Sequence, residues 1–171
     1  MTDQEIELTD LPGGVRFDLD GDGSPEAISW TAPEALDDAF LVLDRNDNNV
    51  VDDGSELFGD ASPQAPNAVP NGFRALAVFD DLVNGGNGDG YISAEDSVFA
   101  SLRLWFDWSH DGISQGTELQ TLAAQGIERI DLRYRETSRR DPYGNEFKFK
   151  SKAIHHSGRR VLIWDVYFLT E

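Results

Sequence analysis

The sequence predicts an α+β fold in which acidic loops and short helices pack against small antiparallel sheets. Two observations carry this prediction. Oxygen-bearing side chains recur at alternate positions in four clusters before residue 127, and an apolar period of two replaces helical spacing after it. With 39% hydrophobic and 11% aromatic residues, the chain of 171 residues is long enough to bury the core of a single domain.

Charge divides the chain into two segments near Gly126. Residues 1–127 carry a net charge of −21, from 25 acids and 4 bases, whereas residues 128–171 carry +3, from 7 acids and 10 bases. Within one domain covering 1–171, we therefore expect an acidic calcium-loop lobe over 15–126 and a basic β-sheet lobe over 127–171. The acidic segment would repel itself unless cations neutralise it. Nucleic acid is not an expected partner, because its binding begins with Lys and Arg on phosphate.

Composition also restricts the metal chemistry and the cellular setting. The chain contains no cysteine, so any metal must be held by oxygen or by the three histidines. No apolar run approaches the roughly 18 residues that span a bilayer, and the acidic start MTDQEIELTD lacks the apolar region of a signal peptide. We expect either a cytoplasmic protein or a module of a larger one.

The first acidic cluster, DLDGDGSPE (18–26), is expected to join two strands, GVRF and AISW. Oxygen ligands at this spacing let a turning backbone wrap one hard cation such as calcium. The expected ligands are Asp18, Asp20, Asp22, Ser24 and Glu26. The loop lacks an acid at the twelfth place, which Asp38, or Asp37 beside it, could supply. The alternative is a hairpin tip with shifted pKa values.

The second cluster, LDRNDNNVVDDGSELFGD (43–60), predicts a longer variant of a calcium loop. Its expected ligands are Asp44, Asn46, Asn48, the Val50 carbonyl, Asp52 and Glu56. Asn49 stands where glycine is usual, and Asn tolerates the left-handed backbone conformation. Because Glu56 comes one residue late, we expect the loop to end in a turn rather than a helix, with Leu57 and Phe58 packed as core.

The third cluster, DDLVNGGNGDGYISAED (80–96), has a well-formed second half. The expected ligands are Asp80, Asn87, Asp89, the Tyr91 carbonyl and Asp96. Its first place falls on a glycine in strict register, so either Asp80 or Asp81 is expected to reach back across a bulged loop. The alternative is a glycine-rich turn with incidental acids.

The fourth cluster, DWSHDGISQGTE (107–118), matches the 12-residue EF-hand loop best. The expected ligands are Asp107, Ser109, Asp111, the Ile113 carbonyl and the bidentate Glu118. Gly112 takes the sharp turn at the sixth place. Ser114 stands at the eighth place, where an apolar residue is usual. The alternative is a solvated acidic turn.

Helical spacing predicts three short helices, over 71–80, 93–107 and 117–126, after the Pro- and Asn-rich connector ASPQAPNAVPNG. The second helix would leave the third loop and enter the fourth, as in a compressed EF-hand pair. Its aromatic residues are expected to be core: Phe99, Trp105 and Phe106. The predicted class is thus α+β, with EF-hand-like calcium loops and short helices packed with small antiparallel sheets.

After Gly126, alternating residues predict strands in IDLRYR (130–135) and EFKFKSKA (146–153), joined by the turn DPYGN. The apolar run RVLIWDVYFL (160–169) predicts a buried central strand. We therefore expect a C-terminal three-stranded antiparallel sheet with one face of Lys and Arg. That face could bind an acidic partner or a neighbouring module, but a solvated face is the favoured interpretation.

The succession FDLDGDG, DDGSELFGD, NGGNGDGYIS and LWFDWSHDGISQGTEL resembles the EF-hand-like calcium-binding modules of large secreted bacterial proteins. These include RTX-type proteins and relatives that bear the calcium-dependent self-processing module of the FrpC type. The likeness is strongest over 15–134. It implies calcium ligands at the positions above and a secreted or cell-surface setting for a module without its own signal peptide.

In that family the scissile Asp-Pro bond precedes the first acidic loop. Here Leu11 separates Asp10 from Pro12, and the sole Asp-Pro pair, Asp141–Pro142, lies in the distal turn. Autocleavage is therefore not expected, and the chain is not expected to be an enzyme.

The leading functional hypothesis is a monomeric calcium-binding structural module of a larger chain, folded and rigidified by about four Ca²⁺ ions. Two alternatives remain. One is a calcium-dependent self-cleaving module that acts through an aspartyl anhydride. The other is a calcium-switched module that binds a protein or glycan through the basic sheet face or exposed aromatics such as Trp108.

Overall fold

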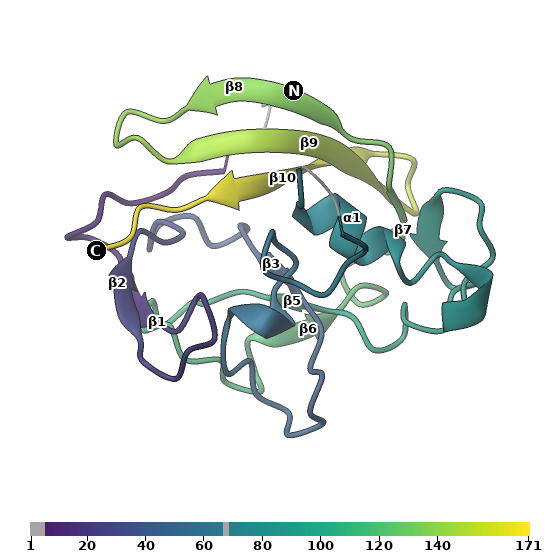
Figure 1. The fold of residues 1–171 in the computed structure, drawn as a ribbon, viewed down its shortest axis with the longest axis horizontal. Coiled ribbons are helices and arrows are strands. Elements are labelled where there is room, and N and C mark those ends of the chain that lie inside the picture. Colours follow the sequence, from purple (N-terminus) through teal and green to yellow (C-terminus); the bar gives the residue numbers. More distant parts are fainter. Residues whose placement is uncertain (1–5, 67–68) are drawn as a thin grey trace.

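The computed structural model describes residues 6–66 and 69–171, and most of its regular elements are β-strands (Figure 1). Ten strands form three antiparallel sheets, and the described residues contain one α-helix, α1 (Gly72–Ala77), of six residues. The predicted α+β class with EF-hand helices is therefore wrong, and the fold is mostly β. Part of the predicted connector, residues 67–68, lies outside the described residues, as do residues 1–5. No helix in the described parts is long and apolar enough to span a membrane.

Two small sheets frame the acidic half of the chain. β1 (Val15–Phe17) pairs with β2 (Glu26–Ile28), which confirms the strands predicted on either side of the first loop. β3 (Phe40–Val42), β5 (Arg103–Trp105) and β6 (Leu119–Thr121) form a second sheet in the order β3-β5-β6. Short strands thus hold the ends of the acidic loops.

Two of the predicted helices are wrong, those over 93–107 and 117–126. Turns and the strands β5 and β6 occupy these segments. Most of the apolar residues at helical spacing are buried, whereas Phe99 is half-buried. Trp105 reaches zero exposure by pairing with Phe40 across β3 and β5. Pairing with a strand about sixty residues away outweighs the local helix preference, which is worth less than about 1 kcal/mol per residue. The compressed EF-hand pair sharing one helix does not form.

The helix predicted over 71–80 is present in a shorter form as α1. Asn71 caps it, because its side-chain oxygen accepts the backbone N–H of Arg74 at 3.0 Å. Phe73 and Leu76 point into the core, with 4% and 2% exposure. The helix leads toward the third acidic loop, as the sequence predicts.

The C-terminal sheet has five strands instead of the predicted three. β10 (Arg160–Tyr167), β9 (Glu146–His155), β7 (Ile127–Asp131) and β4 (Tyr91–Ser93) follow in that order, and β8 (Arg135–Arg140) also pairs with β9. β4 comes from the third acidic loop, so this loop is joined to the sheet. In Figure 1, β8, β9 and β10 lie along the upper side and the two small sheets along the lower side.

The prediction of a buried central strand over 160–169 is also wrong. β10 stands at the edge of its sheet with β9 as its partner, and most of its side chains are half-buried. The sequence of β10 is largely apolar because the strand lines a cavity. Within the described residues, it does not have a neighbouring strand on both sides. β9 takes the inner position, with β7 and β8 pairing along different parts of it.

Two apolar cores hold the sheets together. The first lies against the five-stranded sheet and includes Leu76, Ile92, Leu102, Leu122 and Ile130. The second lies between the two small sheets. It combines the aromatic residues Phe17, Trp30 and Trp105 with the aliphatic residues Ile28 and Val42. Trp30 and Trp105 meet edge to face with ring centroids 5.5 Å apart. The predicted core role of Trp105 is therefore confirmed, and Phe106 is buried as well, at 7% exposure.

Asp165 connects β10 to the helix. Its Oδ2 accepts the backbone N–H of Gly72, the first residue of α1, at 2.8 Å, and the residue is 7% exposed. The pKa of Asp165 is raised to about 6, chiefly by burial and also by the charge of Asp60, whereas the Gly72 bond and Lys148 act in the opposite direction. A carboxylate held in this place therefore costs stability at neutral pH.

Replacing Asp165 by Asn is expected to stabilise the protein at neutral pH. The pKa of the carboxyl is raised on folding, so its cost is absent below about pH 4, grows as pH rises and is complete above about pH 6. Asn keeps an oxygen for the Gly72 N–H. Urea unfolding near pH 7.5 should show a gain of about 1–3 kcal/mol, and near pH 4 the gain should largely vanish. An unchanged or lowered midpoint near pH 7.5 would contradict this account.

Candidate metal centres

The first loop brings three predicted ligands together between β1 and β2. Carboxylate oxygens of Asp18, Asp20 and Asp22 all lie within 4.8 Å of one another, so this group could hold a metal ion. Asp18 accepts the backbone N–H groups of Asp22 at 3.0 Å and of Gly23 at 2.8 Å. Gly23 has a φ of +90°, which lets the backbone turn sharply around the carboxylate. Glu26 closes the loop by accepting a backbone N–H from residue 19 at 3.0 Å.

The other two residues predicted for this loop lie in different places. Ser24 lines a cleft of about 300 Å³ beside the loop, together with Asp20 and Asp22. Asp38 instead lines an apolar cavity beside β10, where its Oδ2 accepts the N–H of Glu7 at 2.9 Å. Within the described ranges, the grouping of acids that could hold a metal does not include Asp38.

The second loop turns as the sequence predicts. Asp44 accepts the N–H groups of Asn48 at 3.2 Å and of Asn49 at 2.7 Å. Asn49 has a φ of +65°, which confirms that it takes the left-handed conformation expected of the missing glycine. The side-chain amides of Asn46 and Asn48 both donate to Oδ2 of Asp52, at 2.8 and 2.7 Å. The predicted ligands Asp44, Asn46, Asn48 and Asp52 are therefore linked by hydrogen bonds within the loop.

Glu56 closes the second loop. It is 1% exposed, and its two oxygens accept the N–H groups of Arg45 at 2.8 Å and of Asp52 at 3.0 Å. A 3₁₀ helix, Gly54–Glu56, ends the loop, and the buried Leu57 then bridges to β3. The expected turn and core anchor are thus confirmed. The side chain of Val50 is 36% exposed, so only its carbonyl remains as a candidate ligand.

The third loop is closed by an acid that lies before its glycines. Asp80 accepts the N–H groups of Gly88 and Gly90, both at 2.9 Å, and is 9% exposed, whereas Asp81 is exposed. Of the two acids left open by the sequence, Asp80 is therefore the one that folds over the loop. Asp96 accepts N–H groups from residues 87 and 93, at 3.2 and 2.7 Å. The remaining predicted ligands follow along the same turn: Asn87, Asp89 and Tyr91.

The fourth loop has the same arrangement. Asp107 accepts the N–H groups of Asp111 at 3.3 Å and of Gly112 at 2.9 Å. Glu118, which is 3% exposed, accepts the N–H of Ser109 at 3.0 Å. Ile113 leaves its side chain 60% exposed, so it too offers only its carbonyl.

Two residues that the sequence prediction did not assign also shape the fourth loop. The indole Nε1–H of Trp30 donates to Oδ2 of Asp107 at 2.8 Å and fixes that carboxylate from the aromatic core. The amide of Gln115 donates to Asp111 at 3.2 Å. Its position at the ninth place of the loop could have identified Gln115, because that place often contributes to the metal site through water. No local signal could have identified Trp30, which is 77 residues away.

The loops contact one another. Ser114, the unusual residue at the eighth place of the fourth loop, accepts the N–H of Val51, at the eighth place of the second loop, at 2.7 Å. The hydroxyl therefore joins two loops where an apolar side chain was expected. Gly54 of the second loop donates its N–H to the carbonyl of Asp18 in the first loop at 2.8 Å. Loops one, two and four thus form a connected group.

In all four loops the first acid accepts backbone N–H groups from the turn, and a later acid accepts N–H groups elsewhere in the loop. These bonds point carboxylates toward the centre of each loop. A centre lined by carboxylate, amide and carbonyl oxygens suits a hard cation. The pattern is the same despite the different lengths of the loops.

Comparison with known proteins identifies a family and a relative of this chain. Residues 1–169 match the family model described as SPM domain. The chain is 40% identical over 154 residues to the iron-regulated protein FrpA of Neisseria meningitidis serogroup C, a match that covers 90% of the chain and 13% of that protein. The chain thus corresponds to a small part of its relative, which confirms the expected relation to a module of a larger bacterial protein. The chain belongs to the SPM domain family.

Proposed function

We propose that this chain is a calcium-binding module whose acidic segment is folded and rigidified by about four Ca²⁺ ions. The observation that carries the proposal is the shared loop geometry, in which a first acid and a closing acid converge on each turn. Calcium fits because it takes oxygen ligands in flexible geometry, and the chain has no cysteine for softer metals. Four Ca²⁺ ions would add a charge of +8 and so partly neutralise the net charge of −21 that residues 1–127 carry.

The setting we propose is a secreted or cell-surface protein, in which this chain is one module next to others. Extracellular calcium modules bind with dissociation constants of roughly 10⁻⁴–10⁻³ M, so irregular loops such as the second would fill in calcium-rich surroundings. We propose that the basic face of the five-stranded sheet faces solvent and does not bind a partner. Lys152 lies 3.5 Å from Asp131, and Lys148 lies 3.3 Å from Glu146, so two of its cations are already paired.

Replacing Glu56 by Gln should remove one calcium site. Both Glu56 oxygens face the second loop, and an amide offers one neutral oxygen in place of a bidentate carboxylate. Calorimetric titration is expected to show one site fewer than the wild-type chain, or one site weakened by about a hundredfold. The matched control is Glu34→Gln, which removes a charge from an exposed position outside the loops. Equal titrations for Glu56→Gln and the control would exclude Glu56 as a ligand.

We also propose that the module does not cleave itself. Anhydride formation needs the aspartate carboxylate at its own carbonyl carbon. Oδ1 of Asp141 instead accepts the N–H groups of Tyr143, Gly144 and Asn145, at 2.8–2.9 Å, and Oδ2 accepts the Asn145 amide at 2.7 Å. These bonds hold the carboxylate toward the residues that follow it.

Mass spectrometry of the intact chain tests this second proposal. The mass is expected to stay constant for hours after calcium addition. The mass of the wild-type chain is compared with that of Asn145→Ala, a variant that lacks the side-chain hydrogen bond to Asp141. A fragment that ends at Asp141 in the wild-type chain would show that the carboxylate leaves this turn and would restore the self-processing alternative.

A further inference from the structure

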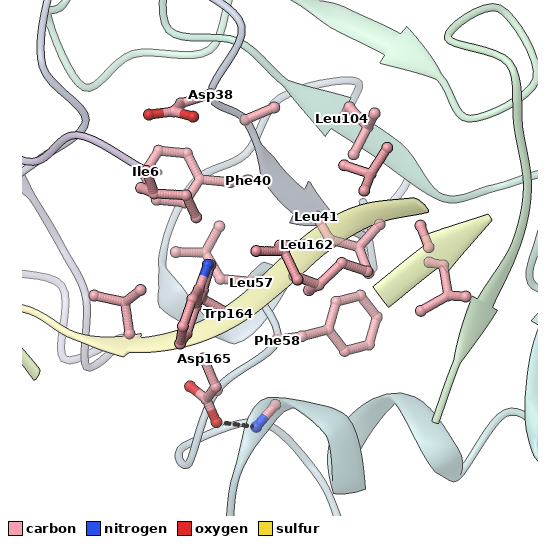
Figure 2. Close-up of a pocket in the computed structure, with 18 of the residues that line it drawn as sticks. Ile6, Asp38, Phe40, Leu41, Leu57, Phe58, Leu104, Leu162, Trp164 and Asp165 are labelled. Atoms are coloured by element: carbon pink, nitrogen blue, oxygen red, sulfur yellow. Dashed lines mark hydrogen bonds between the residues drawn. The ribbon is translucent and has the colours of Figure 1, made fainter. Parts of the chain in front are cut away.

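A large apolar cavity lies beside the free edge of β10 and borders the first two acidic loops through Leu19 and Gly54. Its volume is about 840 Å³, within the range of sites that hold small organic ligands. The walls come from β10, from β3 and from the segment after the second loop, and include Phe40, Leu41, Leu57, Phe58, Leu162 and Trp164 (Figure 2). Several of these side chains are half-buried, and Leu162 is 39% exposed. The molecule thus leaves core-type surface uncovered here.

Four carboxylates stand in this largely apolar lining: Asp37, Asp38, Asp60 and Asp165. Figure 2 shows Asp38 and Asp165 on opposite sides of a group of apolar side chains. Asp165 is deeply buried, and Asp60 lines the same cavity and adds its negative charge. Lys148 partly balances Asp165. A buried carboxylate that costs stability is more typical of a binding site than of a structural support.

Trp164 supplies a hydrogen-bond donor in the same lining. Its indole nitrogen is buried and has no hydrogen-bond partner within the described part of the chain, although the ring lines the cavity. Buried indole N–H groups are usually satisfied. The donor is therefore available to an acceptor on a ligand or to water in the cavity.

The charges along β10 determine at which end of the strand a cation is favoured. Arg160 lies at the opposite end of the strand from Asp165 and also lines the cavity. Five residues of extended chain separate the two by roughly 17 Å. A cation is therefore favoured at the Asp165 end and disfavoured at the Arg160 end, with apolar surface between them.

We infer that this cavity binds an elongated apolar molecule that carries a protonated amino group, with the amino group paired to Asp165. The apolar body lies along β10 against Phe40 and Leu41 of β3. Binding removes half-exposed apolar surface from water and gives the buried carboxylate a counter-ion. Asp165 and the walls from β10 and β3 belong to the sheets, whereas Leu19 and Gly54 come from the first two acidic loops, so the inference is tested with calcium present.

The test compares decylamine with 1-decanol, two probes with the same apolar chain, on the full chain with calcium present. Decylamine is expected to bind with one-to-one stoichiometry by calorimetry, at least about tenfold more tightly than 1-decanol. The indole N–H signal of Trp164, assigned by its loss in Trp164→Phe, should shift in the NMR spectrum with both probes. Equal affinities for the two probes, or no saturable binding, would overturn the inference.

Three variants locate the site. Asp165→Asn should abolish the preference for the amine and leave 1-decanol binding unchanged. Asp10→Asn removes the same charge from an exposed residue outside the cavity, keeps an acceptor for the Gly13 N–H and should behave as wild type. Gly59→Phe adds bulk at a lining position where a Cβ meets nothing within 4 Å, and it should weaken both probes.

Thermal unfolding first checks that each variant is folded. Equal losses in Asp165→Asn and Asp10→Asn would show general attraction of cations to an acidic chain and would overturn the inference. Full binding of decylamine by Gly59→Phe would place the ligand elsewhere, with the same consequence.

Discussion

Calcium is expected to raise the unfolding temperature of this chain by tens of degrees, and a chelator should reverse the rise. Each ion that binds only the folded state adds about 2.7 kcal/mol when its concentration is a hundred times the dissociation constant. For a chain of this size each kcal/mol moves the midpoint by about 2–4 °C. Four ions would thus have a combined effect far larger than that of a typical substitution.

Electrostatic repulsion makes the chelated state weaker still. Residues 1–127 carry a net charge of −21, and in the first loop carboxylate oxygens of Asp18, Asp20 and Asp22 lie within 4.8 Å of one another. Without cations, these charges oppose the compact state. Differential scanning calorimetry with calcium, with chelator and with calcium restored is the measurement. Magnesium is the matched control, because it is smaller and prefers a rigid octahedral site.

Two outcomes would contradict the calcium proposal. One is a midpoint that does not change between calcium and chelator. The other is an equal rise with magnesium and with monovalent salt at the same ionic strength, since that result would indicate screening of the acidic segment instead of bound ions.

Gly54→Ala is expected to cost about 3 kcal/mol or more, which is large for the addition of one methyl group. A Cβ at Gly54 would lie 1.8 Å from the carbonyl oxygen of Leu19. The backbones of the first and second loops would have to separate there, and the bond from Gly54 N–H to the carbonyl of Asp18 would be lost. Urea unfolding with calcium present should show a lower midpoint with little change in slope.

Calcium affinity should fall with stability in this variant, because Gly54 lies between the predicted ligands Asp52 and Glu56. Gly59→Ala is the control: a Cβ at Gly59 meets nothing within 4 Å, so its midpoint should stay within about 0.5 kcal/mol of the wild type. If both variants are equally stable, the close approach of the two loops is not rigid.

The loops were largely predictable from sequence because their geometry is local. Ligand spacing identified the acid that accepts N–H groups from the turn in the first, second and fourth loops, but left Asp80 and Asp81 open in the third. Asn49 was correctly expected to take the left-handed conformation, with a φ of +65°. The late Glu56 correctly indicated a turn at the end of the second loop. In each case, the residues that determine the backbone lie within a dozen positions of one another.

The helices around the loops were not predictable in the same way. Short apolar runs fit helical and extended packing equally well until the partner is known. The segment 93–107 contains a strand because Trp105 pairs with Phe40. The segment 160–169 contains an edge strand because, among the described residues, β10 has β9 as its one strand partner in the sheet. In both cases the partner lies outside the segment, so periodicity could not select between the alternatives.

The sequence by itself determined the chemistry of this protein: four oxygen-rich loops, an acidic segment without thiols, and a basic end that alternates like β-structure. Only the tertiary structure decided the mostly β fold, the separation of Asp38 from the first loop, and the cavity where Asp38 and Asp165 meet apolar walls. The physical reason is the separation along the sequence of the residues that determine each feature. Ligand spacing and turn conformation are set by neighbouring residues, whereas strand pairing, burial and cavities depend on contacts between segments farther apart in the sequence, such as Phe40 with Trp105.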